Sequence, residues 1–291
     1  MKVAVIAHAG KTFGGGLPEL RRVLDAEGVR DPLWCEVPKS KKAPPEVERA
    51  VAEGAELIFA WGGDGMVQRC VDVLAGTDAS LAIIPAGTSN LFATNLGIKK
   101  DIEEAVQVGL SGDRRKLDVG RFNGERFAVM AGAGFDAAMI KDASGLKDRL
   151  GRAAYIFSGT RNLGVESFEA KIKVDGVGWY EGTASCILLG NVGDLFGGIE
   201  VFEDARPDDG LLDLGVVTAA GPVEMARTVV RTAVGTAHKS PFARVTKGRS
   251  VKVKLDRKVR YELDGGDRSK VKSFRVDVEP GVVTVCVPRR T

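Results

Sequence analysis

The chain has few cysteines, and their spacing excludes the sites that cysteines usually build. Its four cysteines include no C-x-x-C pair, so we expect neither a zinc site nor a redox dithiol. The pattern favours buried free thiols in a reducing compartment.

Long apolar runs are also missing. No uninterrupted stretch approaches the roughly 18–20 residues of a membrane-spanning helix. The apolar N-terminus turns polar at His8 and Lys11, too early for a signal peptide. We therefore expect a cytoplasmic protein that is at most peripheral on the inner face of the membrane.

An excess of one charge sign is lacking too. The 42 Lys and Arg residues against 39 Asp and Glu leave a net charge of +3, which is too small to predict nucleic-acid binding by itself. The charged fraction of 28% is that of an ordinary globular protein. A length of 291 residues is long for one core and comfortable for two domains.

Two common nucleotide signatures do not follow the first expected strand, residues 2–7. No G-x-G-x-x-G is present there, which argues against a dinucleotide-binding turn. Gly10-Lys11-Thr12 would end a Walker A loop, but Val5 stands where the first glycine of that loop is needed. The glycine-rich turn at residues 10–16 can still contact a nucleotide from the same side.

What the chain does have is a strand that ends in a glycine turn before a helix. The apolar run at residues 57–61 is followed by Gly62-Gly63-Asp64-Gly65, and apolar residues then recur at helical spacing. Glycines leave backbone N–H groups open to an oxygen-rich ligand. The helix start adds about half a positive charge. The pattern predicts a phosphate site; the alternative is an ordinary turn with an Asp N-cap.

A second junction of the same kind follows. The apolar run 81–84 leads into Pro85-Ala86-Gly87-Thr88-Ser89-Asn90, and a helix is expected from there. Strands alternating with helices predict a doubly wound parallel sheet, in which ligands bind at the carboxyl ends of the strands. Both glycine turns then lie at one edge and can face one ligand.

The second half of the chain has a different pattern. From residue 116 onward, short strands and turns predict a mostly antiparallel β domain, with helical interruptions at 147–163 and 222–235. We place the boundary between a domain of residues 1–115 and one of residues 116–291. The last strands, about 274–288, can return to the first domain.

Three groups of acids stand out in this half. Asp118 begins an expected strand, Asp208 and Asp209 precede a glycine, and Asp264 ends a strand before Gly265. An acidic loop rich in carbonyls suits a hard divalent cation. The alternatives are a solvated strand residue for the first acid and ordinary hairpin turns for the others.

The order of the motifs resembles the bacterial lipid kinases of the diacylglycerol kinase catalytic family, which are related to sphingosine kinases. The resemblance covers nearly the whole chain and rests on Gly62–Gly65, Pro85–Asn90, Asp118, Gly190-Asn191 with Gly197-Gly198, Arg206–Leu211, Asp264-Gly265 and Pro280-Gly281. It implies an α/β nucleotide domain shared with NAD kinases and a C-terminal, mostly antiparallel β-sandwich.

The resemblance also implies a reaction: transfer of the γ-phosphoryl group of ATP to a lipid hydroxyl, such as that of diacylglycerol, in phospholipid biosynthesis. It assigns the general base to Asp264. It assigns Mg²⁺ to Asp64 and Asp118, and a second cation to Asp209 with the carbonyl groups of Arg206 and Leu211. The nucleotide-binding residues would be Gly62, Gly63, Asp64, Gly65, Met66, Gly87, Thr88 and Asn90.

Four positions depart from the family pattern. Met66 replaces a threonine, Leu91 an aspartate, Ile199 a glycine and Gly266 the glutamate of D-G-E. Two alternatives stay open, the second of them because of Met66 and Gly266. One is a soluble-substrate kinase similar to NAD kinase, which shares the first motif but not the later acidic turns. The other is a nucleotide- or lipid-binding member that has lost its chemistry.

A lipid substrate implies contact with a membrane surface. Basic clusters are available at 114–116, at 147–152 and at Arg227 with Arg231, the last pair spaced to share a helix face. The alternative for each cluster is a solvated face. We expect no nucleic-acid partner.

Overall fold

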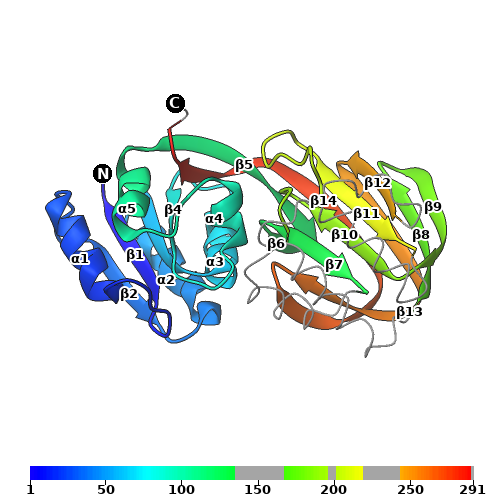
Figure 1. Cartoon of the computed structure of the whole chain (residues 1–291), viewed down its shortest axis with the longest axis horizontal. Helices are drawn as coiled ribbons and strands as arrows, with labels where there is room; N and C mark the ends of the chain where they lie inside the picture. Colours follow the sequence, from blue (N-terminus) through cyan, green and yellow to red (C-terminus); the bar gives the residue numbers. More distant parts are fainter. Residues whose placement is uncertain (135–166, 196–200, 219–242, 290–291) are drawn as a thin grey trace. The chain divides into compact units, whose positions relative to one another are not determined.

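The computed structural model describes residues 1–134, 167–195, 201–218 and 243–289 (Figure 1). The chain divides into two compact units. Unit 1 comprises Met1–Leu117 and Gly281–Thr291, and unit 2 comprises Asp118–Pro280. Two strands, β5 (Asp113–Phe122) and β14 (Gly266–Val287), have residues in both units.

Unit 1 is built on a parallel sheet. Its strands are β1 (Val3–His8), β2 (Leu33–Val37), β3 (Leu57–Gly62) and β4 (Ser80–Pro85), in the order β4-β3-β1-β2. The end of β14 joins beside β4, with Thr284 opposite Ser80. Strands β3 and β4 are buried along their whole length, which explains their unbroken apolar sequences. The expected doubly wound parallel sheet is confirmed.

Helices connect these strands. They are α1 (Gly16–Ala26), η1 (Ser40–Lys42), α2 (Ala43–Ala52), α3 (Asp64–Leu74), α4 (Leu91–Asn95) and α5 (Ile102–Ser111). Helix α3 follows β3 directly, and α4 follows β4 after a short turn. Both glycine turns therefore follow the carboxyl ends of adjacent strands.

Unit 2 is a mostly antiparallel β structure, as expected from its sequence. Its further strands are β6 (Glu125–Phe127), β7 (Met130–Ala133), β8 (Phe168–Val174), β9 (Val177–Ala184), β10 (Cys186–Gly190), β11 (Leu212–Val217), β12 (Ala243–Gly248) and β13 (Ser250–Leu263). The helices expected at 147–163 and 222–235 lie outside the described residues.

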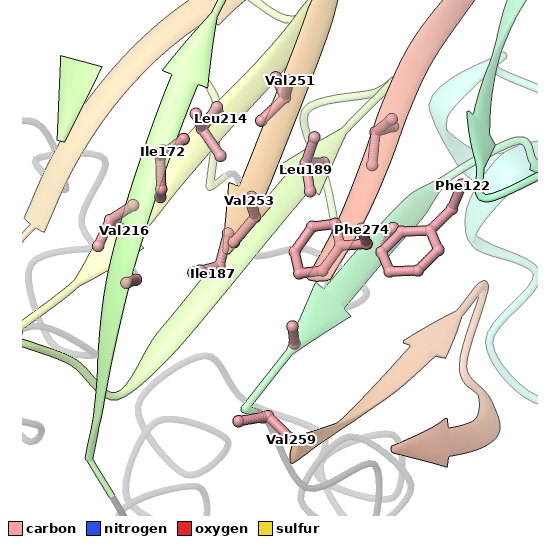
Figure 2. Close-up of a cluster of buried hydrophobic side chains, with 14 of the residues drawn as sticks. Phe122, Ile172, Ile187, Leu189, Leu214, Val216, Val251, Val253, Val259 and Phe274 are labelled. Carbon is pink, nitrogen blue, oxygen red and sulfur yellow. The ribbon is translucent and has the colours of Figure 1, made fainter. Parts of the chain in front are cut away.

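The apolar core of unit 2 fixes the ends of the strands that carry its acids. Figure 2 shows Phe122 beside Phe274, and their ring centroids are 4.5 Å apart. Phe122 also stacks on Tyr261 at 4.4 Å. Phe122 follows Asp118 on β5, and Tyr261 precedes Asp264 near the end of β13. Packing of these rings thus holds the strand segments beside both acids.

Candidate functional site

The two glycine turns of unit 1 contact each other. Gly62 is opposite Pro85 in the parallel register of β3 and β4, and the N–H of Ala86 donates to the carbonyl of Gly62 at 2.8 Å. A Cβ atom added to Gly87 would lie 2.4 Å from the Cα of Gly63. Only glycine allows this approach, so the two turns form one continuous backbone surface.

Asn90 shapes the second turn from within. Its backbone is left-handed, with φ of 50°. Its side-chain Oδ1 accepts from the N–H of Gly87 at 2.8 Å, while Nδ2 donates to the carbonyl of Gly87 at 3.0 Å. The N–H of Gly87 therefore has a partner inside the turn. Thr88 is exposed, so its side chain remains accessible to a ligand.

Asp64 connects the two turns. It is the first residue of α3, and its Oδ1 accepts the N–H of Phe92 in α4 at 3.1 Å. Desolvation raises the pKa of Asp64, and hydrogen bonds from the backbone of Phe92, Leu91 and Asn90 lower it, with a net increase. The carboxylate thus anchors the start of α4 to the start of α3.

The remaining residues of the first turn divide into buried and exposed positions. Met66 is 1% exposed, so its side chain belongs to the core and only its backbone can face a ligand. Gly62 accommodates it, because a Cβ there would lie 2.5 Å from the Cβ of Met66. Gly65 is exposed, and a Cβ there would meet nothing nearer than Ser40 Oγ at 3.8 Å.

Several side chains around these turns were not predicted from the sequence. Trp61 donates its Nε1 hydrogen to the carbonyl of Lys11 at 2.9 Å, and Phe13 stacks on the Trp61 ring at 5.2 Å. The Lys100 ammonium donates to the carbonyl of Gly87 at 2.8 Å and lies 5.6 Å from the centroid of the Phe13 ring. No sequence motif marked Lys100. Lys11, Phe13 and Trp61 were noted only as parts of the glycine-rich turn and the apolar run, because a local pattern does not show contacts with residues distant along the chain.

A cavity of about 620 Å³ adjoins the glycine-rich loop after β1. Its lining residues are Ala9, Lys11, Thr12, Gly14, Gly15, Gly16, Leu17, Pro18, Arg21 and Glu36. The Arg21 guanidinium lies 3.6 Å from the centroid of the Trp34 ring. This loop was expected to contact a nucleotide, and that contact stays a prediction.

In unit 2, Asp118 holds the acidic loop. It is 2% exposed, which excludes the alternative of a solvated strand residue. Its N–H donates to the carbonyl of Pro207 at 2.6 Å, and its Oδ2 accepts the N–H of Gly210 at 2.7 Å. The structure therefore brings Asp118 together with the Arg206–Leu211 loop.

Asp209 closes a turn inside that loop. Its Oδ1 accepts the N–H of Leu211 at 3.0 Å, and its side chain is exposed. Across the described residues, no three His, Cys, Asp or Glu groups cluster in a way that would hold a metal ion. A cation at this loop would take most of its ligands from carbonyl oxygens and water. The cation role of Arg206, Asp209 and Leu211 stays a prediction.

Asp264 binds a segment of backbone that is distant in the sequence. It is 8% exposed and left-handed, with φ of 48°. Its Oδ2 accepts the N–H of Ala128 at 2.8 Å, and its Oδ1 accepts those of Val129 at 2.8 Å and Met130 at 2.9 Å. Three N–H donors stabilise the ionised carboxylate. The general-base role stays a prediction.

Asn191 connects the segments that hold these two acids. Its Nδ2 donates to the carbonyls of Asp118 at 2.8 Å and Ala128 at 3.0 Å. Its Oδ1 is buried and has no hydrogen-bond partner among the described residues. The sequence marked Asn191 only as part of a family motif; Gly197 and Gly198 of the same motif lie outside the described residues.

These features define a class of protein. A parallel α/β unit with two touching glycine turns, followed by an antiparallel β unit, is the fold of kinases related to NAD kinase. Family models match both halves: the diacylglycerol kinase catalytic domain over residues 2–122, and the YegS C-terminal NAD kinase beta sandwich-like domain over residues 129–287.

Individual relatives agree with these matches. The chain is 33% identical over 215 residues to a diacylglycerol kinase of Bacillus subtilis (strain 168), covering 72% of this chain and 71% of the relative. It is 32% identical over 255 residues to a protein of Pseudomonas aeruginosa (strain PAO1) named "Probable lipid kinase YegS-like", covering 83% and 80%.

Solved structures share the fold. A diacylglycerol kinase from Bacillus anthracis str. Sterne superposes with a TM-score of 0.77 at 23% identity, covering 98% of this chain and 96% of that one. An NAD kinase from Archaeoglobus fulgidus gives a TM-score of 0.55 at 12% identity, covering 98% and 93%. At these identities the likeness concerns the fold alone.

The chain belongs to the diacylglycerol kinase and YegS-like lipid kinase family, as its motifs predicted. It is a lipid kinase, a phosphotransferase with an alcohol group as acceptor. Within the described part of the chain, no helix is long and apolar enough to cross a membrane.

Proposed function

We propose that this lipid kinase transfers the γ-phosphoryl group of ATP to the hydroxyl of diacylglycerol or a related lipid. The observation that carries the proposal is the contact between the Gly63 and Gly87 turns at the start of α3. Phosphate oxygens suit such a surface, because backbone N–H groups and the helix dipole both favour negative charge.

The residues of the two turns have different tasks in this proposal. Gly65 and Thr88 face the phosphates, since both are exposed. Gly62, Gly63, Gly87 and Asn90 shape the surface that the phosphates contact, and Met66 contributes backbone only. Asp64 holds the two turns together through Phe92.

Mg²⁺ is part of the proposed reaction, because it would neutralise charge on the phosphates during transfer. Asp64 fits a magnesium ion through water, since one of its oxygens already accepts an N–H group. Magnesium keeps several of its waters in such sites and takes other ligands from the phosphates. Asp118 is a magnesium ligand by the family resemblance alone; in the structure its carboxylate accepts the N–H of Gly210 within unit 2. The loop of Arg206, Asp209 and Leu211 is the proposed site of a structural cation.

Asp264 is the proposed base for the acceptor hydroxyl. Its Oδ1 accepts two N–H groups, whereas its Oδ2 accepts one. The carboxylate as a whole is the group that would accept the proton from a lipid hydroxyl. Gly266 stands where the family has a glutamate, so Asp264 acts in this proposal without that second acid.

The lipid would be reached by peripheral contact with a membrane, and a cytoplasmic location with a role in phospholipid biosynthesis follows from that proposal. Of the basic cluster at 114–116, Arg114 is anchored by donating to the carbonyls of Gly109 and Gly112. The clusters at 147–152 and 227–231 lie outside the described residues.

A phosphorylation assay tests the proposal. The protein is incubated with radiolabelled ATP, Mg²⁺ and either diacylglycerol in mixed micelles or NAD, and the products are separated by thin-layer chromatography. We expect label in the lipid fraction. Label in the NAD fraction instead would support the soluble-substrate alternative. Nucleotide binding without any labelled product would support a member that has lost its chemistry.

A further inference from the structure

Lys100 lies against the second glycine turn. It stands between α4 and α5, next to Asp101, which caps α5 by accepting the N–H of Glu104 at 2.8 Å. Its ammonium reaches back thirteen residues to the carbonyl of Gly87, at 2.8 Å. A lysine that folds back onto this turn places a full positive charge at the surface assigned to phosphate.

Two aromatic rings support this position. The Lys100 ammonium lies 5.6 Å from the centroid of the Phe13 ring, within the range of a cation–π contact. Phe13 stacks on Trp61 at 5.2 Å, and Trp61 is fully buried directly before Gly62. Lys100 is thus connected to both glycine turns, to one through a hydrogen bond and to the other through the rings.

The neighbouring lysine shows a different arrangement. Lys99 pairs with Glu104, with 3.0 Å between Nζ and Oε1. Among the described residues, Lys100 has no carboxylate within ion-pair distance. An ammonium has three donor hydrogens, and the Gly87 carbonyl takes one of them. Two donors therefore remain for an anionic ligand.

A nucleotide bound at the Gly87–Asn90 turn would also need positive charge beside its phosphates. A nucleotide triphosphate carries several negative charges, and phosphoryl transfer depends on neutralising them.

We propose that Lys100 binds the polyphosphate of the nucleotide at the Gly87–Asn90 turn, with Phe13 and Trp61 as its support. The proposal rests on the proposed function of unit 1 as the nucleotide site. The ammonium keeps its bond to the Gly87 carbonyl and donates its other hydrogens to phosphate oxygens. Lys100 thus binds the phosphates of the nucleotide that lie beyond the α-phosphate.

The test compares Lys100→Gln with the matched control Lys99→Gln in the full-length chain. Affinities for ATP, ADP and AMP are measured by isothermal titration calorimetry at two salt concentrations, together with the melting temperature. Loss of a charge-assisted contact should weaken ATP and ADP binding by about 10- to 100-fold. AMP binding should change little, Lys99→Gln should match the wild type, and Lys100→Arg should retain most of the affinity.

The outcomes separate this inference from the proposed function. A wild-type protein that binds no ATP refutes the nucleotide site itself. Wild-type binding that is unchanged in Lys100→Gln overturns the role of Lys100 and leaves the nucleotide site standing. Equal weakening of ATP and AMP, or a lower melting temperature without a change in affinity, also overturns it, because Lys100 would then only support the turn. Selective weakening of ATP and ADP supports it.

Discussion

The carboxylate of Asp264 accepts hydrogen bonds from three backbone N–H groups, and the loss of these bonds determines the effect expected of a substitution. Asparagine has only one acceptor oxygen, and its NH₂ group would face a backbone N–H. We expect Asp264→Asn to lower the free energy of unfolding by about 1–3 kcal/mol. If Asp264 is also the base, turnover should fall by about 10²–10⁴-fold while ATP still binds.

The measurement for Asp264→Asn therefore needs two readouts: urea unfolding and turnover per folded molecule. Asp267→Asn is the matched control, because Asp267 is exposed at the start of β14, directly after the same turn. Turnover that falls only in proportion to the unfolded fraction would make Asp264 a structural anchor and not a base.

Asp213 gives a prediction for pH. Burial raises the pKa of Asp213 to about 6; Lys247, 3.5 Å away, lowers it, while Asp209 and Asp204 raise it. A carboxyl with a raised pKa in the folded state contributes stability that is present below its unfolded value and is lost as the pH rises through about 6. The loss amounts to roughly 3 kcal/mol at most for two pKa units.

Urea unfolding of the wild type and Asp213→Asn at pH 4.5 and pH 7 checks this prediction. The wild type should lose stability relative to the variant as the pH rises, because asparagine does not ionise. A difference between the two proteins that is the same at both pH values would contradict the raised pKa.

At the scale of residues, the sequence marked individual positions but did not show what their side chains contact. Asn90 and Asp264 were assigned to ligands, and both use their side chains on backbone groups, from left-handed conformations. The partners of Asp264 are 134–136 residues away. A local pattern cannot contain such a partner, so the sequence alone could not show it.

At the scale of elements, the touching glycine turns decide which substitution tests phosphate binding. Gly63→Val is a poor choice, because even a Cβ there would lie 3.1 Å from the Cα of Gly87. Gly65→Ala is a better test, because its Cβ would have open space. The helix propensity of alanine is also more favourable than that of glycine by about 1 kcal/mol. We expect Gly65→Ala to keep the melting temperature and to weaken ATP binding.

Gly87→Ala provides the contrast. Its Cβ would lie 2.4 Å from the Cα of Gly63 and 2.7 Å from Asn90 Oδ1. Thermal unfolding should show a clear loss of stability for Gly87→Ala and none for Gly65→Ala. Unchanged ATP affinity in a stable Gly65→Ala protein would contradict a phosphate at the start of α3.

The strands of unit 1 were predictable because burial on both faces leaves unbroken apolar runs between glycine turns. The sequence showed where the Pro85–Asn90 turn lies but not its conformation, because that conformation depends on contact with Gly63 of the preceding turn. Strand β9 (Val177–Ala184) was less visible, because most of its residues are at least partly exposed and its apolar alternation is weak.

At the scale of the whole molecule, family membership leads to a prediction about membranes. A lipid kinase that docks by charge should bind vesicles containing anionic lipid at low salt and lose them as salt rises. Each basic residue near the surface contributes about 1 kcal/mol, and the effect is screened by salt. Co-sedimentation measures the fraction of protein bound to the vesicles. Zwitterionic vesicles serve as the uncharged control, and Lys116→Gln tests the contribution of one basic residue of the 114–116 cluster. No binding to anionic vesicles at low salt would argue against docking by charge.

The function of the molecule was predictable mainly from the order of its motifs, because each motif alone fits an ordinary turn. The order became informative through resemblance to a family, and the family models match the same two halves. Which lipid is accepted depends on the shape of a pocket, and no short motif encodes such a shape.

The return of β14 to unit 1 has a consequence for synthesis on the ribosome. Strand β4 pairs with residues 284–285, and the N–H of Gly76 donates to the carbonyl of Val282. Residues 1–117 leave the ribosome early, yet their sheet lacks this edge until residues 282–285 have been translated. The nascent nucleotide unit must wait with one edge of β4 unpaired, in a state that is prone to aggregation. The nucleotide unit is therefore begun before unit 2 and completed after it, and deletion of residues 282–287 would damage the fold of unit 1.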